Sequence, residues 1–148
     1  RGGAARATGD NRDMFETKPV PAEPDVVAPD GSDVRVLLGV TGGTCAAFDL
    51  APGAVSVAVR HRTVEEIWFV VSGWGALWRQ VDDQDEVVDL DAGVCVTIPV
   101  GTAFQFRCDG DAPLRIVGVT MPPWPGDGEA VRVPGRWAPT IPPGPGLG

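Results

Sequence analysis

The chain has 148 residues, the size of one domain, and a hydrophobic content of 43% that is sufficient for a buried core. Twenty acidic residues against twelve basic ones give a net charge of −8. This acidic balance disfavours contact with phosphate backbones, so we expect no nucleic-acid partner. No apolar run approaches the roughly 20 residues needed to cross a bilayer, so we also expect no membrane partner.

The N-terminal residues 1–30 form a segment without sustained periodicity, and they contain four of the fifteen prolines. Proline lacks a backbone donor and fixes φ, which excludes helices and central strands from such a stretch. We therefore expect residues 1–30 to be flexible or extended. Arg1–Phe15 is polar and has no apolar signal core.

The central residues 31–121 are rich in valine and aromatic side chains and are broken by glycine, proline and aspartate turn signals. Short strands at a spacing of about ten residues are typical of all-β folds. We predict a single antiparallel β-barrel or double-sheet jelly roll. Its expected strands are Val34–Val40, Thr44–Leu50, Val55–Arg60, Glu66–Val71, Gly75–Gln80, Glu86–Leu90, Val94–Ile98, Phe104–Cys108 and Leu114–Thr120.

The C-terminal residues 122–148 hold eight prolines, so we expect an extended tail. This tail carries Trp124 and Trp137, and a wholly free tail would not be expected to expose two tryptophans. We predict that it packs partly on the barrel or on a partner chain.

Three cysteines, Cys45, Cys95 and Cys108, are widely and irregularly spaced. An odd, sparse set argues against a disulfide framework, and no Cys-x-x-Cys pair indicates a thiolate zinc site. We expect three buried free thiols in a reducing cytoplasm.

Two stretches of the central region resemble the sequence motifs of the cupin superfamily. In the first, within Pro52–Gly75, the matching places are Gly53, His61, Glu66 and Gly73. In the second, within Gly93–Phe104, they are Gly93, Pro99 and Gly101. The resemblance covers about residues 34–120 and implies a small single-domain bacterial cupin fold.

The resemblance also implies where a metal ion would be held in a cupin. The corresponding ligand positions here are Val59, His61, Glu66 and Phe104. Two of them are apolar, and His61 is the only histidine in the chain. Because Glu65 or Gln105 would add a third ligand only if strand alternation failed, we predict a degenerate motif and no metal cofactor. The alternative is a divalent transition metal ion bound by His61 and Glu66.

Strand alternation places one set of side chains inside the barrel. The inward set predicts a substrate pocket lined by Val57, Val59, Trp68, Phe104 and Phe106, with His61 and Glu66 as its polar groups. Such a mostly apolar lining with few polar groups is typical of small-molecule sites. Burial raises a carboxyl pKa and lowers an imidazole pKa, so the pair is a plausible site for proton transfer.

We predict a metal-independent enzyme of the isomerase, lyase or cyclase type, acting on a small apolar or aromatic substrate with His61 and Glu66 as catalytic residues. The alternatives are a metal-dependent dioxygenase or cyclase, a non-catalytic small-molecule-binding protein, and a filled barrel that serves only in assembly. A homodimer is expected from the resemblance and from apolar side chains outside the barrel. The candidates for this face are Ile67, Phe69, Val71 and Trp78.

Overall fold

The computed structural model describes residues 14–148, and this part of the chain contains eleven strands and no helix. Among these residues there is accordingly no helix long and apolar enough to cross a membrane. The strands are β1 (Val26–Val27), β2 (Asp33–Val40), β3 (Gly43–Leu50), β4 (Val59–His61), β5 (Glu65–Ser72), β6 (Trp74–Val81), β7 (Gln84–Asp91), β8 (Cys95–Ile98), β9 (Ala103–Cys108), β10 (Leu114–Met121) and β11 (Ala130–Arg132).

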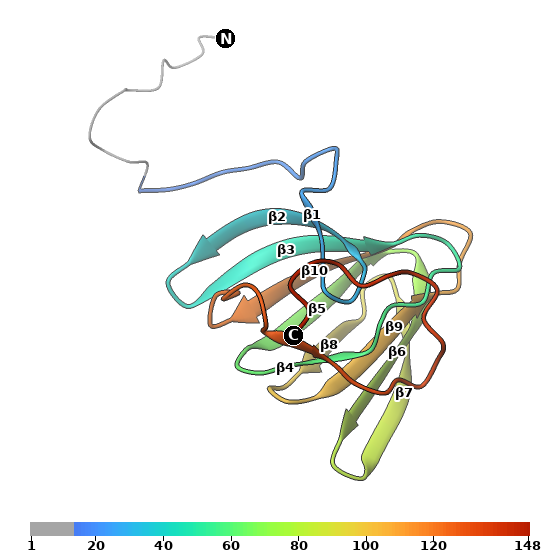
Figure 1. The fold of residues 1–148 in the computed structure, drawn as a ribbon. Helices are drawn as coiled ribbons and strands as arrows, with labels where there is room; N and C mark the ends of the chain where they lie inside the picture. The colour runs from blue at the N-terminus through green and yellow to red at the C-terminus, as the bar shows by residue number, and fades with distance from the viewer. Residues whose placement is uncertain (1–13) are drawn as a thin grey trace.

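The strands form two facing antiparallel sheets, which confirms the predicted all-β jelly roll (Figure 1). One sheet has the order β1-β2-β3-β10-β5-β8, and the other has the order β11-β4-β9-β6-β7. The two sheets are not joined into a closed barrel, so of the two predicted forms the double-sheet form is the one observed. Chain neighbours β4 and β5 lie in different sheets, and the turn between them spans one open end of the sandwich.

The space between the sheets is filled by the alternate side chains that the sequence places inward. Phe48, Trp68, Phe104 and Phe106 meet edge to face, with ring centroids 4.9 to 5.9 Å apart. Edge-to-face contact is the geometry that aromatic quadrupoles favour. The predicted inward and outward faces of β5 are both observed. Trp68 on the inward face is 1% exposed, while Ile67, Phe69 and Val71 on the outward face are about half exposed.

The predicted strand Val55–Arg60 is wrong over most of its length, because β4 covers only Val59–His61. Val57 donates its backbone N–H to the carbonyl of Asp30 in the β1–β2 turn rather than to β9. That bond interrupts the ladder, which is left with an isolated bridge between Val55 and Arg107. The segment before β4 is therefore tied to the N-terminal turn as well as to its own sheet.

Both proline-rich segments add a short edge strand. β1 pairs with β2, and β11 pairs with β4 through Ala130 and His61. Edge positions suit such segments because a missing donor costs least there. In Figure 1 the C-terminal tail lies across the body of the molecule.

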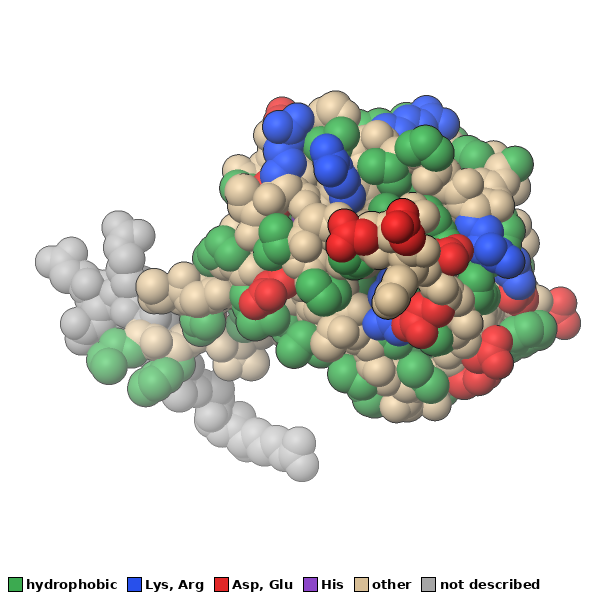
Figure 2. Space-filling model, turned by 90° about the horizontal axis from the view of Figure 1, so that it is seen from below, with side chains coloured by type: hydrophobic (Ala, Val, Ile, Leu, Met, Phe, Trp, Pro, Cys, Tyr) green, Lys and Arg blue, Asp and Glu red, His purple; other side chains and the backbone are tan. Residues whose placement is uncertain are grey.

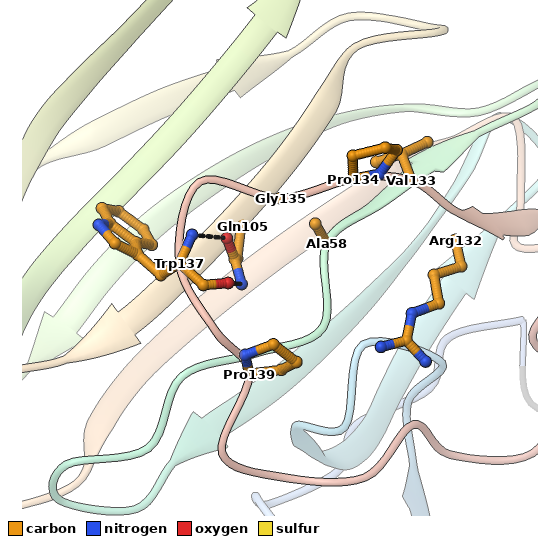
Figure 3. Close-up of a pocket in the computed structure, with 8 residues that line it drawn as sticks. All are labelled: Ala58, Gln105, Arg132, Val133, Pro134, Gly135, Trp137 and Pro139. Carbon is orange, nitrogen blue, oxygen red and sulfur yellow. Dashed lines mark hydrogen bonds between the residues drawn. The ribbon is translucent and has the colours of Figure 1, made fainter.

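A buried glutamine fastens the tail to the outer face of β9. Gln105 donates from Nε2 to the carbonyls of Ser56 and Trp137, and its Oε1 accepts from the Trp137 N–H, at 2.8 to 2.9 Å. The Trp137 ring is also covered by the Arg107 guanidinium at 4.3 Å. Beside this clamp of hydrogen bonds the tail, together with Ala58 and Gln105, lines a surface pocket of about 420 Å³ (Figure 3).

The outer face of β5 is apolar and open. Ile67, Phe69 and Val71 are 44 to 50% exposed. The homodimer expected through this face stays a prediction, but Trp78 does not belong to it. Trp78 is 4% exposed in the other sheet, and its indole donates to Asp85.

The expectation of three buried thiols holds only for Cys108. Cys95 is exposed and Cys45 is partly exposed, because both lie on outward positions of the open sheet. On the face shown in Figure 2, acidic and basic side chains are interspersed among hydrophobic ones, and no histidine is visible.

We expect Gln105→Leu to lower the free energy of unfolding by about 2 kcal/mol, because three backbone groups lose their partner when the amide is removed. Urea unfolding followed by circular dichroism measures the change. Gln84→Leu, at an exposed position in β7, is the control and should change stability by less than about 0.5 kcal/mol. Equal effects of the two substitutions would show that the clamp does not stabilise the fold.

Candidate functional site

The structure brings His61 and Glu66 together at one end of the sandwich. His61 is the last residue of β4, and Glu66 is the second residue of β5 after a three-residue turn. Imidazole Nδ1 and carboxyl Oε2 lie 4.0 Å apart, and the two side chains are 8% and 11% exposed. The separation is too long for a hydrogen bond, so the two groups face each other without being joined.

Aromatic groups surround this pair. The His61 ring lies between Phe104 at 5.2 Å and Trp124 at 5.1 Å, with both meeting it edge to face. The Trp68 indole N–H donates to Glu66 Oε2 at 2.8 Å. The Trp124 backbone N–H donates to the Thr44 hydroxyl, which holds the start of the C-terminal tail over the imidazole.

Two polar atoms at this end of the molecule are buried without a hydrogen-bond partner among the described residues: His61 Nδ1 and Thr102 Oγ1. His61 ends β4 and Thr102 immediately precedes the neighbouring β9, and the Gly101 N–H donates to the His61 carbonyl. An unsatisfied buried polar atom costs about 1 to 3 kcal/mol. Such atoms are rare in folded proteins, so each of the two needs an explanation.

Burial sets the protonation of the pair. Burial raises the pKa of Glu66 to about 8, with the Trp68 hydrogen bond acting against this shift and the charge of Asp30 adding to it. Burial lowers the pKa of His61 to about 4, and the charge of Glu129 opposes this shift. The pKa of Asp30 is itself raised by burial, although Ser32 donates two hydrogen bonds to its carboxyl.

The five residues predicted to line a substrate pocket form the packed core behind His61 and Glu66. Each is 0 to 1% exposed, and they are Val57, Val59, Trp68, Phe104 and Phe106. Two of them contact the polar pair: Trp68 donates to Glu66, and the Phe104 ring meets the His61 ring. The surface pocket beside Gln105 and a second one of about 490 Å³ at the end of the β2–β3 hairpin are lined by other residues. The role of the five in substrate contact stays a prediction.

The residues at this site do not fit a catalytic metal ion. The four motif positions do converge, since Val59 and Phe104 are paired across β4 and β9, but these two side chains carry no donor atom. Within residues 14–148 no three His, Cys, Asp or Glu side chains are grouped to hold an ion. Alternation is also kept: Glu65 is exposed, and Gln105 is used by the tail clamp. Two donors fall short of the usual three.

Asp30, Thr102 and Trp124 belong to the site but were not predicted from the sequence. Asp30 and Trp124 lie in proline-rich segments whose irregular pattern gives no facing direction. Thr102 was the one with a usable signal, because it precedes Phe104 by two residues and therefore shares its inward face.

Several solved structures share this architecture. CapF of Staphylococcus aureus, a capsular polysaccharide assembling protein, is 19% identical with a TM-score of 0.61 over 77% of this chain and 34% of that one. Oxalate decarboxylase of Bacillus subtilis is 18% identical with a TM-score of 0.61 over 76% and 34%. A protein of Bacillus halodurans is 17% identical with a TM-score of 0.56 over 79% of each chain.

These likenesses show the fold alone. The chain spans only about a third of CapF and of oxalate decarboxylase, and the Mn(II) centres described for the decarboxylase are a property of that protein. No curated protein sequence matches the chain. The Cupin domain family, however, matches residues 46–120, about half of the 148 residues, so the chain belongs to the cupin family.

Proposed function

We propose that this cupin is a metal-independent acid–base enzyme of the isomerase, lyase or cyclase type, in which His61 is the general base and Glu66 the general acid. The observation that carries the proposal is the buried His61 Nδ1, which has no partner among the described residues and lies 4.0 Å from Glu66 Oε2. A histidine that served only stability would be expected to have its nitrogen hydrogen-bonded.

The protonation states suit these roles. With a pKa of about 4, the imidazole is neutral above pH 4 and can accept a proton. With a pKa of about 8, the carboxyl keeps its proton below pH 8 and can donate it. Two titratable groups whose environments push their pKa values apart form an acid and a base at the same pH. Between pH 4 and 8 the imidazole is therefore neutral and the carboxyl is protonated, so the pair carries no net charge and holds one base and one acid.

A proton shift on a carbonyl compound shows how the pair would act. His61 removes a proton from the carbon beside the carbonyl, and the electrons of the broken C–H bond form an enol-type double bond. The Glu66 O–H bond breaks and its proton passes to the oxygen or to the far carbon. The pair is left as imidazolium and carboxylate, and the Trp68 indole N–H stabilises the carboxylate. Release of the imidazolium proton to solvent and uptake of a solvent proton by the carboxylate restore the starting state.

The surroundings favour a small, neutral, apolar or aromatic substrate. Phe104 borders the imidazole and Trp68 borders the carboxyl group, and burial in such surroundings would penalise an ionised substrate. The packed core closes the space behind the pair, so the substrate takes the position of the Trp124 indole against His61. Binding therefore requires residues near Trp124 to move, and Gly126 and Gly128, both with positive φ, follow it closely.

We expect the protein to catalyse exchange of the α-hydrogen of a neutral aryl ketone for deuterium in D₂O, measured by loss of the proton signal in NMR spectra. His61→Ala should lower the exchange rate by about 10²-fold or more, because general base catalysis contributes that much. The rate should be constant between about pH 4 and pH 8, and it should fall outside this range as His61 gains or Glu66 loses its proton.

The control is Gln84→Ala, which changes an exposed residue of β7 and should leave the rate unchanged. The measurements are repeated after treatment with EDTA, which should have no effect. Exchange that survives in both His61→Ala and Glu66→Gln would remove the proposed mechanism. A rate abolished by EDTA would replace it with metal-dependent chemistry.

The raised pKa of Glu66 also predicts how stability depends on pH. Between pH 4.5 and about 8 the folded state keeps a proton that the unfolded state releases, so stability falls as pH rises. His61 has the opposite effect, but only between about pH 4 and 6.5. From pH 6.5 to 8 the wild-type protein should lose up to about 1.4 kcal/mol per pH unit.

Glu66→Gln should flatten this slope, because the amide does not titrate. Urea unfolding at pH 6.5, 7.2 and 8 gives the comparison, and Glu65→Gln on the exposed face of the same strand is the matched control. If Glu66→Gln and wild type show the same slope, the Glu66 carboxyl is already ionised at pH 6.5 and is no general acid.

A further inference from the structure

Glu129 is a buried carboxylate in the C-terminal tail, and it contacts the turn that connects the two site residues. The side chain belongs to a residue that is only 5% exposed. It immediately precedes Ala130, which β11 pairs with His61. The residue lies outside the stretch 46–120 that matches the Cupin domain.

Glu129 accepts a hydrogen bond from every residue of that turn. Its Oε1 accepts from the backbone N–H groups of Thr63 at 2.6 Å and Val64 at 2.7 Å, and its Oε2 accepts from the Thr63 hydroxyl at 2.9 Å. Its own carbonyl accepts from the Arg62 N–H at 3.0 Å. Three consecutive residues, which are all that separate β4 from β5, are thus held by one residue of the tail.

The side chain that makes these bonds is charged. Burial alone would raise the pKa of Glu129, but the hydrogen bonds from Thr63 and Val64 and the nearby imidazole lower it below the ordinary value. A carboxylate that accepts two backbone N–H bonds is stabilised in its ionised form. The negative charge in turn raises the pKa of His61 against the effect of burial.

We propose that Glu129 is a positioning residue that acts from the C-terminal tail: it fixes the turn between His61 and Glu66, and thereby their spacing, and it places a negative charge near the imidazole. The expected effect of Glu129 on the reaction rate rests on the proposed acid–base function. A turn fixed by charge-assisted bonds keeps two side chains at a defined separation, and a misplacement of about 1 Å is enough to cost about 10² in rate.

The groups that face the pair come from three elements. Glu66 on β5 faces the imidazole at 4.0 Å, the charge of Glu129 in the tail raises the pKa of His61, and the charge of Asp30 in the β1–β2 turn raises the pKa of Glu66. Arg60 and Arg62, the chain neighbours of His61, are exposed. Removal of the Glu129 charge should therefore change the titration of His61.

The test follows the His61 imidazole by ¹⁵N and ¹³C NMR, where the single histidine gives one unambiguous set of signals. Glu129→Gln keeps the shape and an acceptor for the two backbone N–H groups but removes the charge. We expect His61 to titrate at lower pH in this variant than in wild type, with the low-pH limb of deuterium exchange moving in the same direction. Glu129→Ala should in addition shift the Thr63 and Val64 amide signals and lower the exchange rate about 10²-fold.

Glu65→Gln is the matched control, because it removes an exposed carboxylate one residue beyond the same turn and should change none of these signals. If Glu129→Ala does not fold, Glu129→Gln and Glu129→Asp carry the test. An unchanged His61 titration in folded Glu129→Gln overturns the inference even where exchange activity is found. A changed titration without any exchange activity leaves the positioning role standing and removes the proposed function.

Discussion

A neutral imidazole and a carboxyl group held 4.0 Å apart, out of water, form the constraint on which this end of the molecule depends. Neither group is in its most stable environment. The imidazole Nδ1 of His61 lacks a hydrogen-bond partner within residues 14–148, and burial deprives the Glu66 carboxyl of the ionised form that it would have in water at neutral pH. Two β-strands in different sheets carry the pair, so the short turn between them fixes how the groups meet. The cost in stability is small against the total of a domain, but it is large for a single contact.

The C-terminal tail supplies much of what keeps this arrangement in place. Trp124 covers the imidazole, and Gln105 holds the tail to the outer face of the second sheet at Trp137. The stretch that matches the Cupin domain, residues 46–120, ends before both Trp124 and Trp137. The site therefore consists of the cupin sandwich together with the C-terminal tail. Residues 46–120 alone would lack the contact between Trp124 and the imidazole.

How far the sequence predicts this molecule depends on local pattern. Alternation of inward and outward residues placed His61, Glu66 and Trp68 correctly, because period two is a property of every strand. The short extent of β4 was missed, since the bond from Val57 to Asp30 joins segments that are distant in the chain. Residues of the proline-rich tail were missed for the same reason: without periodicity their direction is decided by tertiary contacts alone.

The apolar residues at two motif positions explain both what the site lacks and what it has. Val59 and Phe104 are paired across β4 and β9, so they remove two donor atoms from the same place. They also put hydrocarbon where polar groups would otherwise solvate the pair, and burial is the largest cause of both pKa shifts. A cation would favour the carboxylate and lower the pKa of Glu66. With hydrocarbon there instead, Glu66 keeps its proton at neutral pH, so the two side chains that carry no metal-binding atom also favour the protonation states on which the proposed acid–base role rests.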